Sequence, residues 1–224
     1  MPLQHAHYAV RVTAEQRAYA DALVGHAMAH HSVSNVWDGD PRHAGRTREL
    51  RTTGTLGEVV FADAYGLARP ERSFGADDGQ DYGRDFVLVV GGAPRRVDVK
   101  AMGRRSPRLE PHYVLNVSAR QLRRDDGETD LFAHVSLSPR GRPTAAVLVG
   151  AVSRAALLAG RAGRLFRAGA VRTRANGTTF AFYEDTYEIR MDAFGPLPPP
   201  AGPARELGAA RRGGRPGDAA PPRR

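Results

Sequence analysis

Residues 85–101 have the sequence DFVLVVGGAPRRVDVKA, and this stretch decides the fold that the chain predicts. The apolar run at 85–90 is typical of a buried strand. Gly91 and Gly92 supply a tight turn, and the chain then returns as a second strand over 95–101. The stretch therefore predicts an antiparallel hairpin within a larger sheet.

The second strand of this hairpin carries an acidic and a basic residue on one face. Asp98 and Lys100 are separated by one residue, so in a strand both side chains point to the same side. Val97 and Val99 then point to the other side, into a core. Lys100 is also the only lysine in a chain whose lysines and arginines together number 33. Because lysine supplies a compact ammonium that arginine cannot replace, we expect Lys100 to have a chemical role.

A second carboxylate, Asp85, stands where the first strand begins. The hairpin can bring Asp85 close to Asp98, and two such carboxylates repel each other unless a cation lies between them. Mg²⁺ is the expected ion, since hard cations prefer oxygen ligands. Asp81 is the alternative ligand, although its place in a glycine-rich loop is typical of a turn residue. Lys100 beside the metal would orient a water or offset charge that develops on a phosphate.

Glu58 is a further acidic candidate, in a helix expected over residues 55–66. Leu56, Val59 and Val60 are spaced as the buried face of that helix. A helix packed on the hairpin would aim Glu58 at the same metal. The alternative is a capping box, because Thr55 and Glu58 have the spacing of that motif.

Gly57-Glu58 on a helix, Asp85 before an apolar strand and Asp98-Val99-Lys100 together resemble the motif of the PD-(D/E)XK nuclease superfamily, which has a restriction-endonuclease-like fold. The resemblance covers about residues 50–160 and implies a core of helix, three strands, helix and strand. It also implies metal-dependent hydrolysis of phosphodiester bonds, with Mg²⁺ or Mn²⁺ as the cofactor. The roles implied are Asp85 and Asp98 as metal ligands, Glu58 as an accessory acid, the Val99 carbonyl as a further ligand and Lys100 as the catalytic lysine.

The chain departs from the family pattern in two places. No proline precedes Asp85, and no glutamine follows Lys100 closely, which is a feature of one branch of the superfamily. The second departure argues against membership of that branch and not against the fold.

The rest of the chain predicts a mixed α/β (α+β) domain, with a central mixed sheet flanked by helices. A first helix is expected over 11–31, with Thr13 and Gln16 at capping-box spacing, and a polar loop follows over 32–53. The other expected elements are strands at 113–118, 131–137, 144–150 and 187–191, and short helices at 119–124 and 154–160, the last capped by Ser153.

We expect one domain over residues 1–194, divided into a helical part (1–54), the core (about 55–160) and C-terminal strands (161–194). From residue 195 to residue 224 the composition changes to proline, glycine, alanine and arginine without periodicity. Such a composition is typical of a disordered tail.

The charge balance predicts a polyanionic partner. The chain has a formal net charge of +9 and no cysteine, which leaves out disulfides and thiolate chemistry. Nucleic acid, DNA rather than RNA, is the expected partner, held through phosphate contacts. The arginines expected to make those contacts are Arg104, Arg105, Arg108, Arg120, Arg123 and Arg124.

Export and membrane insertion are not expected. No charged leader with an apolar core begins the chain, and no apolar run has membrane-spanning length. We therefore expect a cytoplasmic protein without a membrane partner.

These observations predict a metal-dependent endonuclease, a hydrolase that is compatible with a homodimer. The alternative is a catalytically inactive nucleic-acid-binding or accessory module on the same fold. An unrelated basic α/β protein associated with RNA is the third interpretation.

Overall fold

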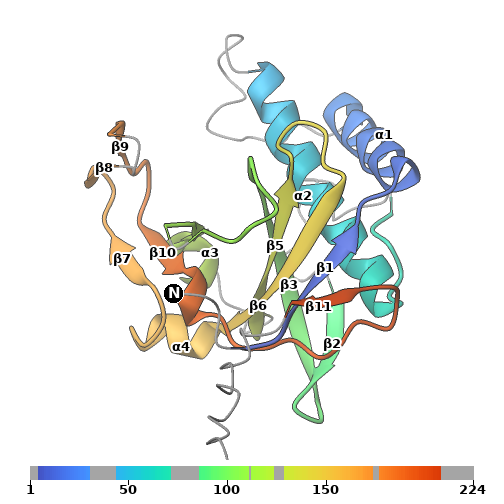
Figure 1. Ribbon diagram of the computed structural model, residues 1–224. Helices are drawn as coiled ribbons and strands as arrows, with labels where there is room; N and C mark the ends of the chain where they lie inside the picture. The colour runs from blue at the N-terminus through green and yellow to red at the C-terminus, as the bar shows by residue number, and fades with distance from the viewer. Residues whose placement is uncertain are drawn as a thin grey trace, which may run out of the picture.

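The computed structural model describes residues 5–30, 44–71, 86–110, 112–123, 129–173 and 177–207. A curled mixed sheet stands at the centre, with two long helices on one face and a smaller sheet on the other (Figure 1). The expected mixed α/β class with a central sheet is therefore confirmed. No helix in the described part of the chain is both long enough and apolar enough to cross a bilayer.

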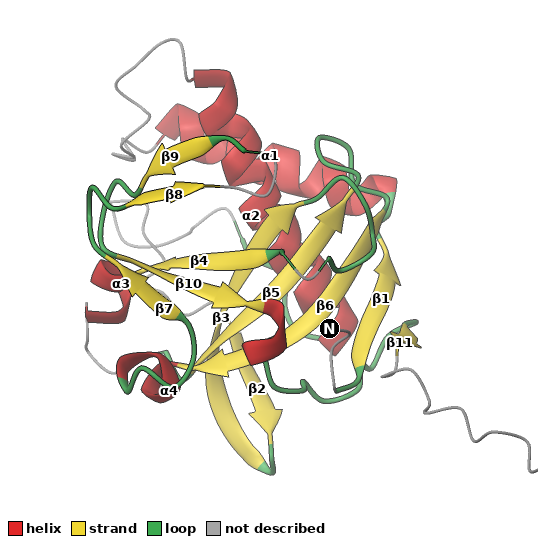
Figure 2. Cartoon of the chain, turned by 60° about the vertical axis from the view of Figure 1, so that its left-hand side comes forward, coloured by secondary structure: helices red, strands yellow, loops and turns green. Residues whose placement is uncertain are grey.

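The central sheet contains six strands in the order β11-β1-β6-β5-β3-β2. Only β3 and β5 pair in parallel, and the other neighbours are antiparallel. The β2–β3 hairpin forms one side of the sheet, and its turn extends away from the other strands (Figure 2). The strands are Arg205–Leu207 (β11), His7–Arg11 (β1), Ala145–Ser153 (β6), Leu131–Ser138 (β5), Ala93–Gly103 (β3) and Phe86–Val90 (β2).

Helices α1 (Ala14–His30) and α2 (Ala44–Tyr65) cover one face of this sheet. Val97 and Val99 of β3 are buried in the same apolar cluster as Val59 and Val60 of α2. The expectation that Val97 and Val99 point into a core is confirmed. Since side chains alternate along a strand, Asp98 and Lys100 face away from α2.

The opposite face packs against a three-stranded sheet and two short helices, and a two-stranded hairpin extends beyond them (Figure 1). The order in the smaller sheet is β4-β10-β7. Strand β6 is buried on both sides, because Leu148 packs toward the long helices and Val149 toward the smaller sheet. The elements of this layer are β4 (Val114–Ser118), β10 (Thr186–Arg190), β7 (Arg164–Phe166), α3 (Ala119–Arg123), α4 (Arg154–Leu158), β8 (Val171–Thr173) and β9 (Thr179–Ala181).

Local signals predicted several of these elements correctly. The hairpin forms with Phe86 opposite Val97 and Val90 opposite Ala93. The expected cap of α4 is confirmed, because the Ser153 hydroxyl accepts a hydrogen bond from the backbone N–H of Ala156.

Two expectations about the N-terminal part are wrong. Helix α2 begins at Ala44, so residues 44–53 are helical and not loop. This segment is largely polar and lacks an apolar stripe, yet it contains no proline and simply extends the amphipathic part of α2. Strand β1 was also not expected. It is only 5 residues long, and its burial alternates, with Tyr8 and Val10 facing inward.

The expected disordered tail from residue 195 is wrong as far as residue 207. Gly195 forms an antiparallel bridge with Ala151, and the backbone N–H of Gly202 donates to the carbonyl of Ala64 at 3.1 Å. Leu197 is buried in the core, and β11 pairs with β1 at the sheet edge. These contacts are non-local, so composition alone could not show them. Residues 208–224 lie outside the described residues.

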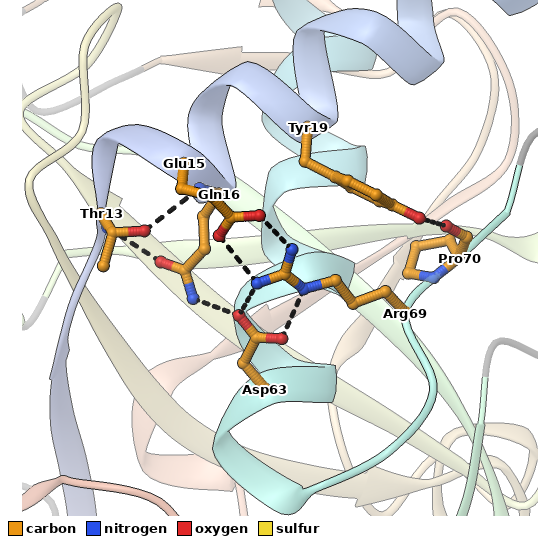
Figure 3. Close-up of polar contacts among 7 residues, drawn as sticks. All are labelled: Thr13, Glu15, Gln16, Tyr19, Asp63, Arg69 and Pro70. Atoms are coloured by element: carbon orange, nitrogen blue, oxygen red, sulfur yellow. Dashed lines mark hydrogen bonds and ion pairs between the residues drawn. The ribbon is translucent and has the colours of Figure 1, made fainter.

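A polar network joins α1 to the C-terminal end of α2 (Figure 3). The predicted capping box is confirmed, because the backbone N–H of Gln16 donates to the Thr13 hydroxyl and the backbone N–H of Thr13 donates to the Gln16 side chain. The Gln16 amide also donates to Asp63 of α2 at 2.6 Å. Arg69 completes the link with hydrogen bonds to both Asp63 and Glu15. The network holds the two helices in one orientation.

Helix α2 and strand β3 make their closest approach at Gly57. A Cβ atom at this position would lie 2.3 Å from the Cβ of Ala101. Because the Ala101 methyl is attached directly to the backbone, it cannot move aside without moving the strand. Glycine at position 57 therefore permits the observed distance between helix and sheet.

We expect Gly57→Ala to lower the free energy of unfolding by about 1–3 kcal/mol, since overpacking costs more than the gain in helix propensity. Gly54→Ala is the matched control in the same helix, because a Cβ there has no atom within 4 Å. The control should raise stability by up to about 1 kcal/mol. Urea unfolding measures both, and equal stabilisation by the two variants would contradict the close contact.

Candidate active site

The centre of the candidate site is a close ion pair on β3. The Lys100 Nζ lies 2.6 Å from the Asp98 Oδ1, and the exposed fractions of the two side chains are 29% and 1%. The prediction that both residues share one face of the strand is confirmed. Because the Asp98 carboxylate is buried, this is not an ordinary ion pair between two exposed side chains.

A residue that the sequence did not single out holds the other oxygen of Asp98. The side-chain amide of Gln121, on α3, donates a hydrogen bond to Asp98 Oδ2. Gln121 follows Asp98 by 23 residues. It is therefore not equivalent to the glutamine that stands shortly after the lysine in one branch of the superfamily. It reaches the site because α3 precedes β5, the strand parallel to β3. Only its position on a predicted helix between two predicted strands could have pointed to it.

His134 of β5 lies beside Lys100 and is fully buried. Its Nδ1 is 2.9 Å from the main-chain carbonyl of Lys100, which makes Nδ1 the donor and leaves Nε2 without a proton. No described residue donates to Nε2. Burial is the main cause that lowers the pKa of His134 to about 4, and the charge of Arg104 lowers it further. The imidazole is therefore neutral at physiological pH.

Glu58 is in α2, and the structure leaves its expected role at the metal a prediction. It follows Gly57 on α2, the helix that packs on the Val97 and Val99 face. The capping-box alternative for Glu58 is wrong, because α2 begins at Ala44 and Thr55 is internal to it.

Three of the predicted residues lie outside the described residues. They are the metal-ligand candidates Asp85 and Asp81 and the phosphate-contact candidate Arg124. The last described pair of the hairpin is Phe86 opposite Val97. In the sequence, Asp85 directly precedes Phe86 and Asp98 directly follows Val97. The expectation that these two carboxylates meet stays a prediction.

The arginines expected to contact phosphates have different environments. Arg105, Arg108 and Arg120 are exposed. Arg123 lies 3.7 Å from Asp185, so its charge is partly neutralised. Arg104 is partly buried and stacks on an aromatic ring, with its guanidinium carbon 4.3 Å from the centre of Tyr113.

The chemistry of the described donors suits a hard divalent cation. The buried carboxylate of Asp98 and the main-chain carbonyl of Val99 are oxygen ligands of the type that Mg²⁺ and Mn²⁺ accept. Within the described residues no group of three histidine or acidic side chains is arranged to hold a metal, and Asp85 is not among those residues. The described part of the site thus supplies one carboxylate to such an ion.

Comparison with protein-family models, with curated proteins and with solved structures found no match. The argument for function therefore depends on the geometry of the site and on the motif.

We expect the buried neutral His134 to make stability depend on pH. The unfolded chain takes up a proton near the ordinary histidine pKa of 6.5, whereas the folded chain resists it down to about 4. Stability is therefore full above about pH 6.5 and falls by up to about 3 kcal/mol as the pH decreases to about 4. Urea unfolding across this range measures the loss.

His134→Gln is the control, because glutamine can still donate to the Lys100 carbonyl but does not titrate. Acid denaturation of other groups affects both proteins, so the difference between their pH profiles isolates His134. Parallel profiles would show that the imidazole does not resist protonation.

Proposed function

We propose that this protein is a metal-dependent endonuclease that hydrolyses phosphodiester bonds in DNA. The observation that carries the proposal is the buried Asp98 carboxylate paired at 2.6 Å with the only lysine of the chain. A buried ion pair gains little net stability, because the attraction between the charges must offset their desolvation. A reaction centre is a physical reason for such a pair to be present.

The order of elements around the pair supports the proposal. Helix α2 packs on the β2–β3 hairpin, and the chain then passes through α3 to β5, which lies parallel to β3. This order is compatible with the restriction-endonuclease-like core that the motif implies. The third strand after α2 departs from that core, since β4 belongs to the smaller sheet, and β1, β6 and β11 extend the central sheet.

The chemistry follows from the positions of the side chains. Mg²⁺ or Mn²⁺, when bound, would polarise the scissile phosphate as a Lewis acid. Asp98 and the Val99 carbonyl would hold the ion, with Asp85 and Glu58 as the further ligands that the motif implies. The ammonium of Lys100 would hold the attacking water and offset negative charge on the phosphate in the transition state. Gln121 keeps the Asp98 carboxylate in a fixed orientation.

One observation favours the second candidate, an inactive nucleic-acid-binding module on the same fold. Both oxygens of Asp98 already have protein partners, Lys100 and Gln121. For metal to bind, the carboxylate must exchange or share one of these contacts. DNA binding in EDTA without cleavage in Mg²⁺ would favour this candidate.

We expect Lys100→Ala to reduce Mg²⁺-dependent nicking of supercoiled plasmid by about 100-fold or more, because a charge aimed at the transition state is lost. Lys100→Arg should also be strongly impaired, since the guanidinium is larger and planar. Arg95→Ala is the matched control, an exposed cation on the same strand, and should cleave normally. Folding is checked by thermal melting.

Cleavage of plasmid DNA and of single-stranded RNA by the unmodified protein, each measured with and without Mg²⁺, shows which nucleic acid is the substrate. Nicking by Lys100→Ala at the rate of the unmodified protein would overturn the proposed mechanism. The absence of any metal-dependent cleavage by the unmodified protein would overturn the proposed activity.

A further inference from the structure

Arg104 continues the polar face of β3 that carries the candidate site. Asp98, Lys100 and Met102 alternate along this face, and Arg104 follows directly after the strand. Its Nη2 lies 3.4 Å from the Met102 sulfur, which places the guanidinium on the same side. Four residues of extended chain span about 13 Å, so Lys100 and Arg104 are two cations separated along one strand.

The charge of Arg104 has no carboxylate partner among the described residues. Its guanidinium donates to the main-chain carbonyl of Val114 at 2.7 Å, and its Nε has no acceptor in the described part of the chain. Burial lowers the pKa of Arg104, which shows that the surroundings disfavour the cation. Other arginines with short ion pairs differ in this respect: Arg69 with Asp63 and Glu15, Arg140 with Glu49, and Arg172 with Glu188.

The position of Arg104 is held rigidly. Its backbone N–H donates to the carbonyl of Leu137 at 2.7 Å, and its own carbonyl accepts from the N–H of Arg140 at 2.7 Å. The stack on Tyr113 fixes the plane of the guanidinium. Such an arrangement is costly for a cation without an anion and is well suited to receiving one, because little side-chain entropy remains to be lost on binding.

We infer that Arg104 binds a second phosphate of the nucleic acid, next to the phosphate that reacts at Lys100. The inference depends on the proposed function and specifies its substrate: a polynucleotide strand that extends along β3 beyond the bond that is cut. Val114 and Met102 occupy Nη2, so Nη1 is the terminal nitrogen left to donate to a phosphate. Arginine is suited to this contact because its planar group presents several donors to phosphate oxygens.

A purely structural role is the alternative, since Arg104 also links β3 to β4 through Val114. The two roles differ in their dependence on salt. A phosphate contact releases counterions, and its loss lowers the slope of log Kd against log salt by about one. Loss of a purely structural contact with Val114 would lower the melting temperature without changing that slope.

The test is fluorescence anisotropy with a labelled DNA oligonucleotide over a range of salt concentrations, in EDTA so that no cleavage occurs. We expect Arg104→Gln to weaken binding about tenfold at low salt and to lower the slope by about one. Arg140→Gln is the matched control, because it removes a nearby positive charge that Glu49 already neutralises. The control should leave the slope unchanged.

An unchanged slope for folded Arg104→Gln would overturn the inference, whether or not the protein cleaves DNA. If Arg104→Gln does not fold, Arg104→Lys decides. This variant keeps the charge and a donor for Val114, so weaker DNA binding at an unchanged melting temperature supports the phosphate contact, and unchanged binding overturns it.

The same experiment separates this inference from the proposed activity. Binding that depends on Arg104, together with no cleavage in Mg²⁺, would support the phosphate contact and overturn the endonuclease. Metal-dependent cleavage, together with DNA binding that does not change when Arg104 is replaced, would support the endonuclease and overturn the phosphate contact. No binding to DNA or RNA by the unmodified protein would overturn both.

Discussion

The contact between Gly57 of α2 and Ala101 of β3 is the constraint on which the candidate site depends. Because Gly57 has no Cβ, the helix lies directly on the strand that carries Asp98 and Lys100. Val97 and Val99 are then buried against the helix, and strand alternation turns the polar pair to the other face. One small residue thus determines which side of β3 is available for chemistry.

The opposite face combines groups that would not stabilise a fold by themselves. The Asp98 carboxylate, with 1% exposure, pairs with Lys100, and the neutral His134 donates a hydrogen bond to the Lys100 carbonyl. Arg104 follows on the same face without an anionic partner among the described residues. Desolvated charges are costly, and apolar side chains of similar size would often stabilise a strand more. Their concentration on one face of one strand supports the proposed anionic substrate. The neutral state of His134 fits this arrangement, because it adds no third positive charge beside the two cations.

Much of the hairpin and its polar face could be predicted from the sequence, because the signals are local. The paired glycines predicted the turn, alternation predicted the faces, and the hydroxyl of Ser153 predicted a helix start. Non-local contacts could not be predicted. Gln121 reaches Asp98 only through the crossover to β5, and β11 forms only because β1 offers an edge to it.

The surroundings of individual charged side chains could not be predicted from the sequence either. The six arginines after the motif have the same side chain, and nothing in their spacing distinguishes Arg104 from Arg105 or Arg108. Burial and the ring of Tyr113 make that distinction, and both depend on how the loop after β3 folds back to β4. For Glu58 the local signal was misleading, because its capping-box spacing lies inside a longer helix.

The central claim is that Asp98 and Lys100 form a reaction centre and not a structural ion pair. The double variant Asp98→Asn/Lys100→Met tests it most directly, because both charges are removed while the shapes, and an acceptor for Gln121, are kept. The melting temperature and Mg²⁺-dependent plasmid nicking are measured on the same preparation. The account predicts a melting temperature equal to or above that of the unmodified protein, since the buried charge at position 98 is removed, together with loss of nicking. Nicking at the unmodified rate by the folded double variant would contradict the account.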